Sequence, residues 1–280
     1  MSLRPFHDYA IMCSPAQTIT NGLKMKDRGV LKFERAEAQY GVYQREVRNL
    51  GYTIISMPAN DDFPDSVFPE DPGVILQLGK KNLLVVTRLK DPSRQGEEAI
   101  LEKALAPYFK DVEHITPPGF VEGGDVLVTD HGLYIGLSGR TNAHGAEQLA
   151  KIAKDQFGMN TKIFTIPPNW LHLKGGASYH RAWSGQKPVI VVSAPIEHHF
   201  VDTPGCEVMI TSEAEHYAYY SPNCLSKGKN ILVHQHSHGV IRQMERVGFN
   251  VIETDLSEFW KIDGAMTCLS KIFQSTVVVH

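Results

Sequence analysis

A chain of 280 residues with 42% apolar and 21% charged residues has the composition of a soluble globular protein. Its formal net charge of −3 gives no electrostatic footprint for binding nucleic acid or an anionic membrane. No apolar run approaches the roughly 20 residues that span a bilayer, and the N-terminus lacks the apolar core of a signal peptide. The four cysteines, at 13, 206, 224 and 268, form no CxxC pair. We therefore expect a reduced cytoplasmic protein.

Strand and helix patterns alternate along the chain. Strands are predicted at 82–88, 112–115, 132–138, 161–166, 230–234 and 250–253, and helices at about 95–110, 143–157 and 240–247. The helices carry apolar residues at spacings of three and four, as at Leu101, Ala104 and Leu105. This recurrence predicts repeated modules, although a doubly wound sheet shows the same alternation. The absence of a GxGxxG or P-loop turn disfavours that sheet, and without a linker we expect one domain over 1–280.

The segment 61–72 combines five carboxylates with Phe63, Phe68 and three prolines. The prolines forbid a regular helix and stiffen the backbone. Rigid carboxylates beside aromatic rings suit a planar cation, because a guanidinium pairs with carboxylate and stacks on rings. The alternative is an acidic surface loop that two phenylalanines anchor.

Three further candidates lie at junctions between loops and strands. Glu122 opens a Glu-Gly-Gly-Asp turn that ends at Asp125, His172 precedes two glycines, and Cys268 follows a polar turn and enters a strand predicted at 268–273. A cysteine with a histidine elsewhere is a candidate nucleophile and acid/base pair, and Glu122 could orient the imidazole. Each has a plainer alternative: a turn, a core histidine and a buried, inert thiol.

His234, His236 and His238 alternate along an extended segment, as ligands of a metal could. No nearby carboxylate or thiolate completes a set, and His238-Gly239 has the pattern of a turn into the next helix. We predict no metal site here.

Five motifs fall in the order seen in the dimethylarginine dimethylaminohydrolases, at 63–72, 122–125, 136–142, 171–174 and 261–268. The chain resembles this family from about residue 11 to residue 273. The family belongs with arginine deiminases and amidinotransferases to the guanidine-modifying superfamily. The resemblance implies a five-bladed α/β propeller (the pentein fold), with ββαβ modules around a central channel that holds the active site.

The resemblance also implies roles for individual residues. Cys268 would be the nucleophile and His172 the general acid/base, with Glu122 orienting it. The residues implied to bind substrate are Asp65 and Asp71 on the guanidinium with Glu70 beside them, Arg94 and Arg140 on the carboxylate, Leu23 in a lid loop, and Asp263. No metal or organic cofactor is expected.

The implied reaction is cleavage of a guanidine C–N bond, most simply Nω-methylated L-arginine giving L-citrulline and methylamine or dimethylamine. Alternatives are arginine deiminase, amidinotransferase, a hydrolase of another guanidino or ureido compound, and a silent binding protein. Lys174, where deiminases carry an aspartate, favours alkylated substrates. Cys13, in place of a lid-region arginine, and a poorly matching stretch at 182–220 depart from the family pattern. The partner expected is a guanidino amino acid, and the sequence leaves a homodimer open.

Overall fold

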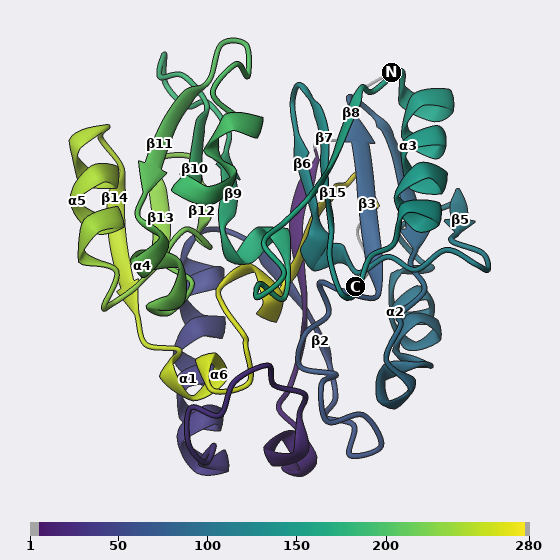
Figure 1. Cartoon of the computed structure of the whole chain (residues 1–280). Coiled ribbons are helices and arrows are strands. Elements are labelled where there is room, and N and C mark those ends of the chain that lie inside the picture. The colour runs from purple at the N-terminus through teal and green to yellow at the C-terminus, as the bar shows by residue number, and fades with distance from the viewer. Residues whose placement is uncertain (1–5, 278–280) are drawn as a thin grey trace.

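The computed structural model describes residues 6–277, which form five three-stranded sheets arranged as a ring (Figure 1). Every sheet repeats one pattern. An inner strand pairs antiparallel with a middle strand, and the middle strand pairs parallel with an outer strand. This is the ββαβ module, and its fivefold repetition gives the α/β propeller that the sequence predicted.

The sheets, from inner to outer strand, are as follows. The first has β15 (Lys271–Ser275), β1 (His7–Cys13) and β2 (Thr53–Met57); the second β3 (Gly73–Leu78), β4 (Lys81–Val86) and β5 (Val112–His114); the third β6 (Val126–Thr129), β7 (Gly132–Leu137) and β8 (Thr161–Thr165); the fourth β9 (Ala177–His180), β10 (Val189–Ser193) and β11 (Glu207–Thr211); the fifth β12 (Leu225–Lys227), β13 (Asn230–His234) and β14 (Asn250–Thr254).

Helices connect the middle and outer strands of four modules: α1 (Phe33–Asn49), α2 (Glu97–Leu105), α3 (Ala143–Phe157) and α5 (His238–Arg246). The helix at 143–157 agrees with its prediction because the side chain of Asn142 caps its N-terminus and Gly158 ends it at φ 67°. The helix predicted to reach about 110 ends at Leu105, two residues before Pro107. Within the described part of the chain, no helix has the length and apolar character to cross a bilayer.

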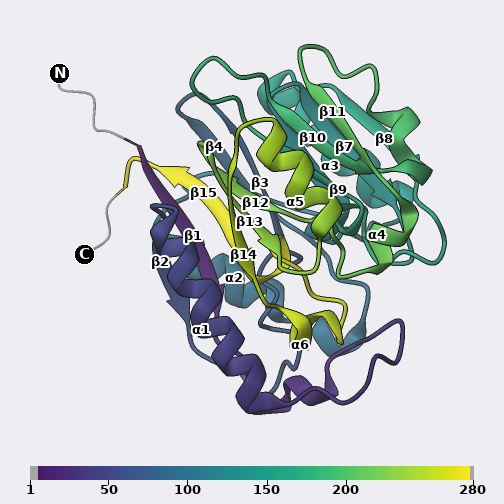
Figure 2. The same cartoon turned by 90° about the vertical axis from the view of Figure 1, so that its left-hand side faces the viewer.

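The ring closes through the two ends of the chain. β15, next to the C-terminus, pairs antiparallel with β1, as Figure 2 shows, with Phe273 opposite Tyr9. Five buried apolar clusters occupy the five interfaces between neighbouring modules; one contains Leu76 of β3, Ile135 of β7 and Leu149 of α3. Because the strands form separate sheets with cores between them, the doubly wound alternative is wrong.

Two local expectations change. Cys268 lies in a 3₁₀ turn (Thr267–Leu269), and the strand predicted from this residue begins only at Lys271. The stretch 182–220, which departs from the family pattern in sequence, connects β10 to β11 through a 3₁₀ segment (Ala194–His199), where the other four modules have an α-helix. A short helix, α4 (Glu213–Tyr217), follows it.

Candidate active site

The proposed functional residues occupy equivalent places in different modules. Asp71 directly precedes the turn into β3, Glu122 the turn into β6, His172 the turn into β9 and Cys268 the turn into β15. Since the inner strands surround the central channel, the turns before them meet at one end of it. These four side chains line one pocket there, together with Leu23, Asp65, Arg94, Arg140 and Asp263.

His172 forms the shortest polar contact of this pocket that involves a catalytic candidate. Its Nε2 lies 2.7 Å from Oε2 of Glu122, and both side chains are buried. Burial alone would lower the pKa of His172, but the negative charges of Asp71, Asp125 and Glu122 outweigh it and raise the pKa to about 9. His172 is therefore an imidazolium at neutral pH and can act as a general acid.

The turn that carries Cys268 is fixed from both sides. The buried hydroxyl of Tyr43 donates to the carbonyl oxygen of Met266 at 2.5 Å and lies 2.9 Å from Oγ of Ser270. Burial and then the charge of Asp71 raise the pKa of the Cys268 thiol to about 12. The thiol is therefore neutral in the ligand-free protein, and a bound cation would favour the thiolate.

Asp65 and Asp71 are buried acceptors in the same pocket. Asp71 accepts from Nη1 of Arg94 at 2.8 Å and from the backbone N–H of Gly124 at 3.0 Å. Burial opposes ionisation of Asp71, but His172 and Arg94 prevail and lower its pKa, whereas burial keeps the pKa of Asp65 raised. The two carboxylates can thus receive N–H donors from a planar cation.

The loop at 22–30 covers the pocket. The backbone N–H of Leu23 donates to both carboxylate oxygens of Asp65, at 3.2 and 3.1 Å. The enclosed volume is about 30 Å³, room for roughly one water molecule. An amino acid can enter only when this loop moves away and releases Asp65.

Asp263 holds the covering loop. Its carboxylate accepts from Nη1 of Arg28 at 2.5 Å, from the hydroxyl of Tyr220 at 2.6 Å and from the backbone N–H of Met25 at 2.5 Å. The sequence predicted a substrate-binding role for Asp263, and the structure gives it this anchoring contact as well. Arg28 and Tyr220 were missed, because neither lies in a motif and they meet Asp263 only in the folded chain.

The two arginines predicted to bind the substrate's carboxylate, Arg94 and Arg140, differ in how tightly other side chains hold them. Arg94 is buried between Asp71 and Glu97, with a bidentate ion pair to Glu97 whose shortest N–O distance is 2.8 Å. Arg140 forms longer ion pairs, 3.5 Å from Glu122 and 3.7 Å from Asp91, and its side chain is 19% exposed. It lines the pocket and is held less tightly than Arg94. The sequence analysis did not predict a role for Glu97, because a glutamate in a helical pattern is normally exposed at the surface.

Glu70 is the predicted site residue that the structure does not bring into this pocket. It points to the other side of the channel, where it pairs with Lys174 and Lys271. Both residues lie in the turn before β3, where Asp71 lines the pocket of the thiol and Glu70 lines the cavity on the opposite side of the channel. Cys13, the departure noted in the lid region, is buried at the end of β1 outside the pocket.

Asp71, Glu122 and His172 offer atoms within 4.8 Å of one another, a spacing that a metal ion could use. These atoms already pair with one another and with Arg94. Of the histidines at 234–238, His234 stacks on Tyr219 with ring centres 4.2 Å apart. The prediction that the protein uses no cofactor remains untested.

Comparison with known proteins agrees with this geometry. A family model described as N,N dimethylarginine dimethylhydrolase, eukaryotic, matches residues 13–165. The dimethylarginine dimethylaminohydrolase of Pseudomonas aeruginosa is 30% identical over 273 residues, which cover 95% of this chain and 99% of that protein. This chain belongs to the dimethylarginine dimethylaminohydrolase family. A relative of the same name from Streptomyces coelicolor is 27% identical and covers 93% of the chain.

Solved structures extend the family assignment to the fold. A mutant of the Pseudomonas aeruginosa dimethylarginine dimethylaminohydrolase in complex with citrulline superimposes with a TM-score of 0.81 at 30% identity, covering 95% of this chain and 98% of that one. The N-terminal domain of an arginine dihydrolase from cyanobacteria gives a TM-score of 0.78 at 20% identity, over 95% and 97% of the two chains. The latter supports the shared pentein fold alone.

Proposed function

We propose that this protein hydrolyses Nω-methylated L-arginine to L-citrulline and methylamine or dimethylamine. The observation that carries the proposal is one buried pocket that joins a thiol, an imidazolium paired with a carboxylate, and two further carboxylates. The thiol provides a nucleophile, the imidazolium an acid, and the carboxylates a cradle for a guanidinium.

The reaction begins when Asp65 and Asp71 hold the guanidinium plane, leaving its central carbon open to Cys268. The thiolate sulfur forms a bond to this carbon and gives a tetrahedral adduct. His172 donates its proton to the substituted nitrogen, the C–N bond breaks, and the amine leaves. A covalent S-alkylthiouronium remains on Cys268.

Hydrolysis of the thiouronium completes the cycle. His172, now neutral, removes a proton from a water molecule that attacks the same carbon. The C–S bond then breaks, the thiolate returns, and the added hydroxyl group releases its remaining proton to solvent, which leaves the ureido carbonyl of citrulline. Glu122 stabilises the charged form of His172 before the first proton transfer and after the second, through the 2.7 Å hydrogen bond.

Mass spectrometry of quenched turnover tests this mechanism. We expect an adduct of the substrate's amidine carbon on the peptide that contains Cys268, and its absence in the Cys268→Ser variant together with loss of citrulline formation. Turnover that survives Cys268→Ser without any adduct would overturn the mechanism.

An arginine deiminase on the same fold is the second candidate. By the family resemblance, the residue that corresponds to Lys174 in arginine deiminases is an aspartate that binds the unsubstituted guanidine. Here Lys174 lines the opposite side of the channel and pairs with Glu70, so no carboxylate from this position reaches the substrate. We therefore expect citrulline to form faster from Nω,Nω-dimethylarginine than from arginine; the reverse order would favour the deiminase.

An amino-acid substrate is proposed from Arg140, whose guanidinium lines the pocket and whose ion pairs with Glu122 and Asp91 are long, at 3.5 and 3.7 Å. Losing a charge-assisted clamp costs about 2–5 kcal/mol in binding. Arg140→Ala should lower kcat/KM for dimethylarginine and leave activity on a methylated agmatine, which lacks the carboxylate, nearly unchanged. Equal losses on both substrates would remove the case for an amino acid.

Residues 1–280 are proposed to work as a single catalytic domain, because the pocket draws on modules from both ends of the chain. The cytoplasmic location and a homodimer remain predictions. The four cysteines are unpaired in the described chain, as a reducing compartment would keep them.

A further inference from the structure

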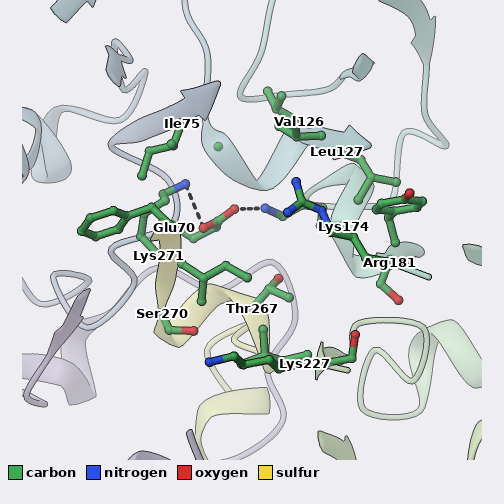
Figure 3. A pocket seen from close by; sticks show the side chains of 18 of the residues that line it. Glu70, Ile75, Val126, Leu127, Lys174, Arg181, Lys227, Thr267, Ser270 and Lys271 are labelled. Carbon is green, nitrogen blue, oxygen red and sulfur yellow. Dashed lines mark ion pairs between the residues drawn. The ribbon is translucent and has the colours of Figure 1, made fainter. Parts of the chain in front are cut away.

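A cavity larger than the active-site pocket lies on the side of the channel away from Cys268. Its volume is about 350 Å³, and it takes residues from all five inner strands, β3, β6, β9, β12 and β15 (Figure 3). We call it the rear cavity. No residue lines both this cavity and the active-site pocket. The volume falls within the range that holds small organic molecules in proteins.

The floor of the rear cavity carries an unbalanced charge. The ammonium groups of Lys174 and Lys271 lie on either side of the Glu70 carboxylate, and Lys271 Nζ is 2.8 Å from Oε2 (Figure 3). All three residues are largely buried. Among residues 6–277, Glu70 is the one carboxylate that pairs with either ammonium. Two buried lysines therefore share one carboxylate. Burial lowers the pKa of both, that of Lys271 to about 7, so keeping both as ammonium ions is costly unless something else supplies negative charge.

The other two cations of the lining are already paired. Lys227 lies 2.8 Å from Asp8, and Arg181, at the exposed rim, lies 3.1 Å from Asp130. The excess positive charge of the lining therefore comes from Lys174 and Lys271 over Glu70, and amounts to one charge when both lysines are protonated. Burial, and then the neighbouring charge of Lys271, lower the pKa of Lys174, as expected for an ammonium whose compensation is incomplete.

Apolar side chains form the walls above this floor. Ile75, Val126 and Leu127 surround it in Figure 3, and Ile272, 38% exposed, adds an apolar side at the rim. A phosphate ion could pair with the lysines of the floor, but it would gain nothing from the apolar walls. A monocarboxylate with an apolar body uses both, and its single charge matches the one uncompensated ammonium.

We propose that the rear cavity binds a small organic monocarboxylate, with its head on Lys174 and Lys271 and its apolar chain along Ile75, Val126 and Leu127. The site is separate from the catalytic pocket, and the inference does not depend on the proposed reaction. Each end of the channel would then bind a different charge: a guanidinium cation at the front and a carboxylate anion at the rear.

Isothermal titration of the full chain with acetate, butyrate and hexanoate tests the proposal. Affinity should rise roughly threefold to fourfold for each methylene that the walls cover. Lys271→Met, which keeps a side chain of similar length, should weaken hexanoate binding at least about tenfold. Ile272 is 38% exposed, so Ile272→Ser is not expected to unfold the protein. This variant should reduce the increase in affinity from acetate to hexanoate and leave the affinity for acetate unchanged.

Two controls locate the binding. Lys81→Met removes the same charge at an exposed position of β4 outside both cavities, and should bind as the wild type does. Arg140→Ala alters the front pocket and should also bind normally. The proposal is overturned if no carboxylate saturates the protein, if acetate and hexanoate bind equally, or if Arg140→Ala abolishes binding that Lys271→Met leaves intact.

Discussion

The two ends of the central channel are built from neighbouring residues and differ in their chemistry. Asp71, Glu122 and Cys268 line the front pocket, while Glu70, Gly123 and Thr267, each one residue earlier or later, line the rear cavity. The front is a tight space of about 30 Å³ rich in carboxylates; the rear is an open space of about 350 Å³ rich in lysine.

A small difference in position along the chain separates two environments. In the turns before three inner strands, one residue of each neighbouring pair lines the front pocket and the other lines the rear cavity: Asp71 and Glu70, Glu122 and Gly123, Cys268 and Thr267. Carboxylates near the front pocket raise the pKa of His172 to about 9, and the two rear lysines, Lys174 and Lys271, share the single carboxylate of Glu70. Variants at each end show how independent the two ends are.

The largest effect is expected for His172→Asn, because it removes the proton donor for the leaving amine. General acid–base catalysis contributes about 10²–10⁴-fold, so kcat should fall by about 10³-fold at neutral pH. Gln77→Ala, which alters the lining of the rear cavity alone, should change kcat less than about twofold. Steady-state citrulline formation measures both, and equal losses would show that the two ends are not separable.

A methyl group at Gly123 should disturb both ends together. A Cβ there would overlap the backbone carbonyl oxygen of Glu70, which belongs to the partition between the cavities, and that backbone has little room to move. We expect Gly123→Ala to lower the free energy of unfolding by about 1–3 kcal/mol or more. Gly139→Ala, where a Cβ meets nothing within 4 Å, is the matched control in urea unfolding. Similar stabilities of the two variants would contradict the close approach.

Glu122→Gln should alter the pH dependence of the front alone. The folded pKa of His172 is raised to about 9, so the imidazolium acid is present below that pH and is lost as pH rises through it. Removing the Glu122 charge lowers this pKa, and the alkaline limb of kcat should move to lower pH, with kcat reduced about 10–10²-fold. The dependence of kcat on pH tests this expectation. If the alkaline limb has the same position in Glu122→Gln as in the wild type, that limb reports the titration of a group other than His172.

The smallest effect concerns the loop that only the front possesses. Arg28→Gln removes the ion pair that holds this loop on Asp263, a charged contact of about 1.5–3 kcal/mol. The amides of 22–28 should exchange hydrogen at least about tenfold faster, and those of β6 at the rear should not change. Lys24→Gln, which breaks an exposed pair with Asp27, is the control and should have little effect. No change with Arg28→Gln would show that Asp263 does not fasten the loop.

The sequence by itself determined the repeating modules and the candidates for chemistry. Local patterns suffice for this: the capped, amphipathic helix at 143–157, the strand runs, and Glu122, His172 and Cys268 at junctions between loops and strands. The family motifs then implied roles for these residues, and the pocket brings them together with Asp65, Asp71, Arg94 and Arg140.

Only the tertiary structure decided which side chains meet. The pairing of β15 with β1 joins residues more than 250 positions apart, and it alone turns five modules into a ring with two ends. The tertiary structure also brings Lys271 to Glu70 and Arg28 to Asp263, and no local sequence pattern encodes these contacts. The resemblance placed Glu70 beside Asp71 at the substrate, but proximity in sequence does not show the direction of a side chain. In the folded chain, the turn before β3 sends the two carboxylates to opposite ends of the channel.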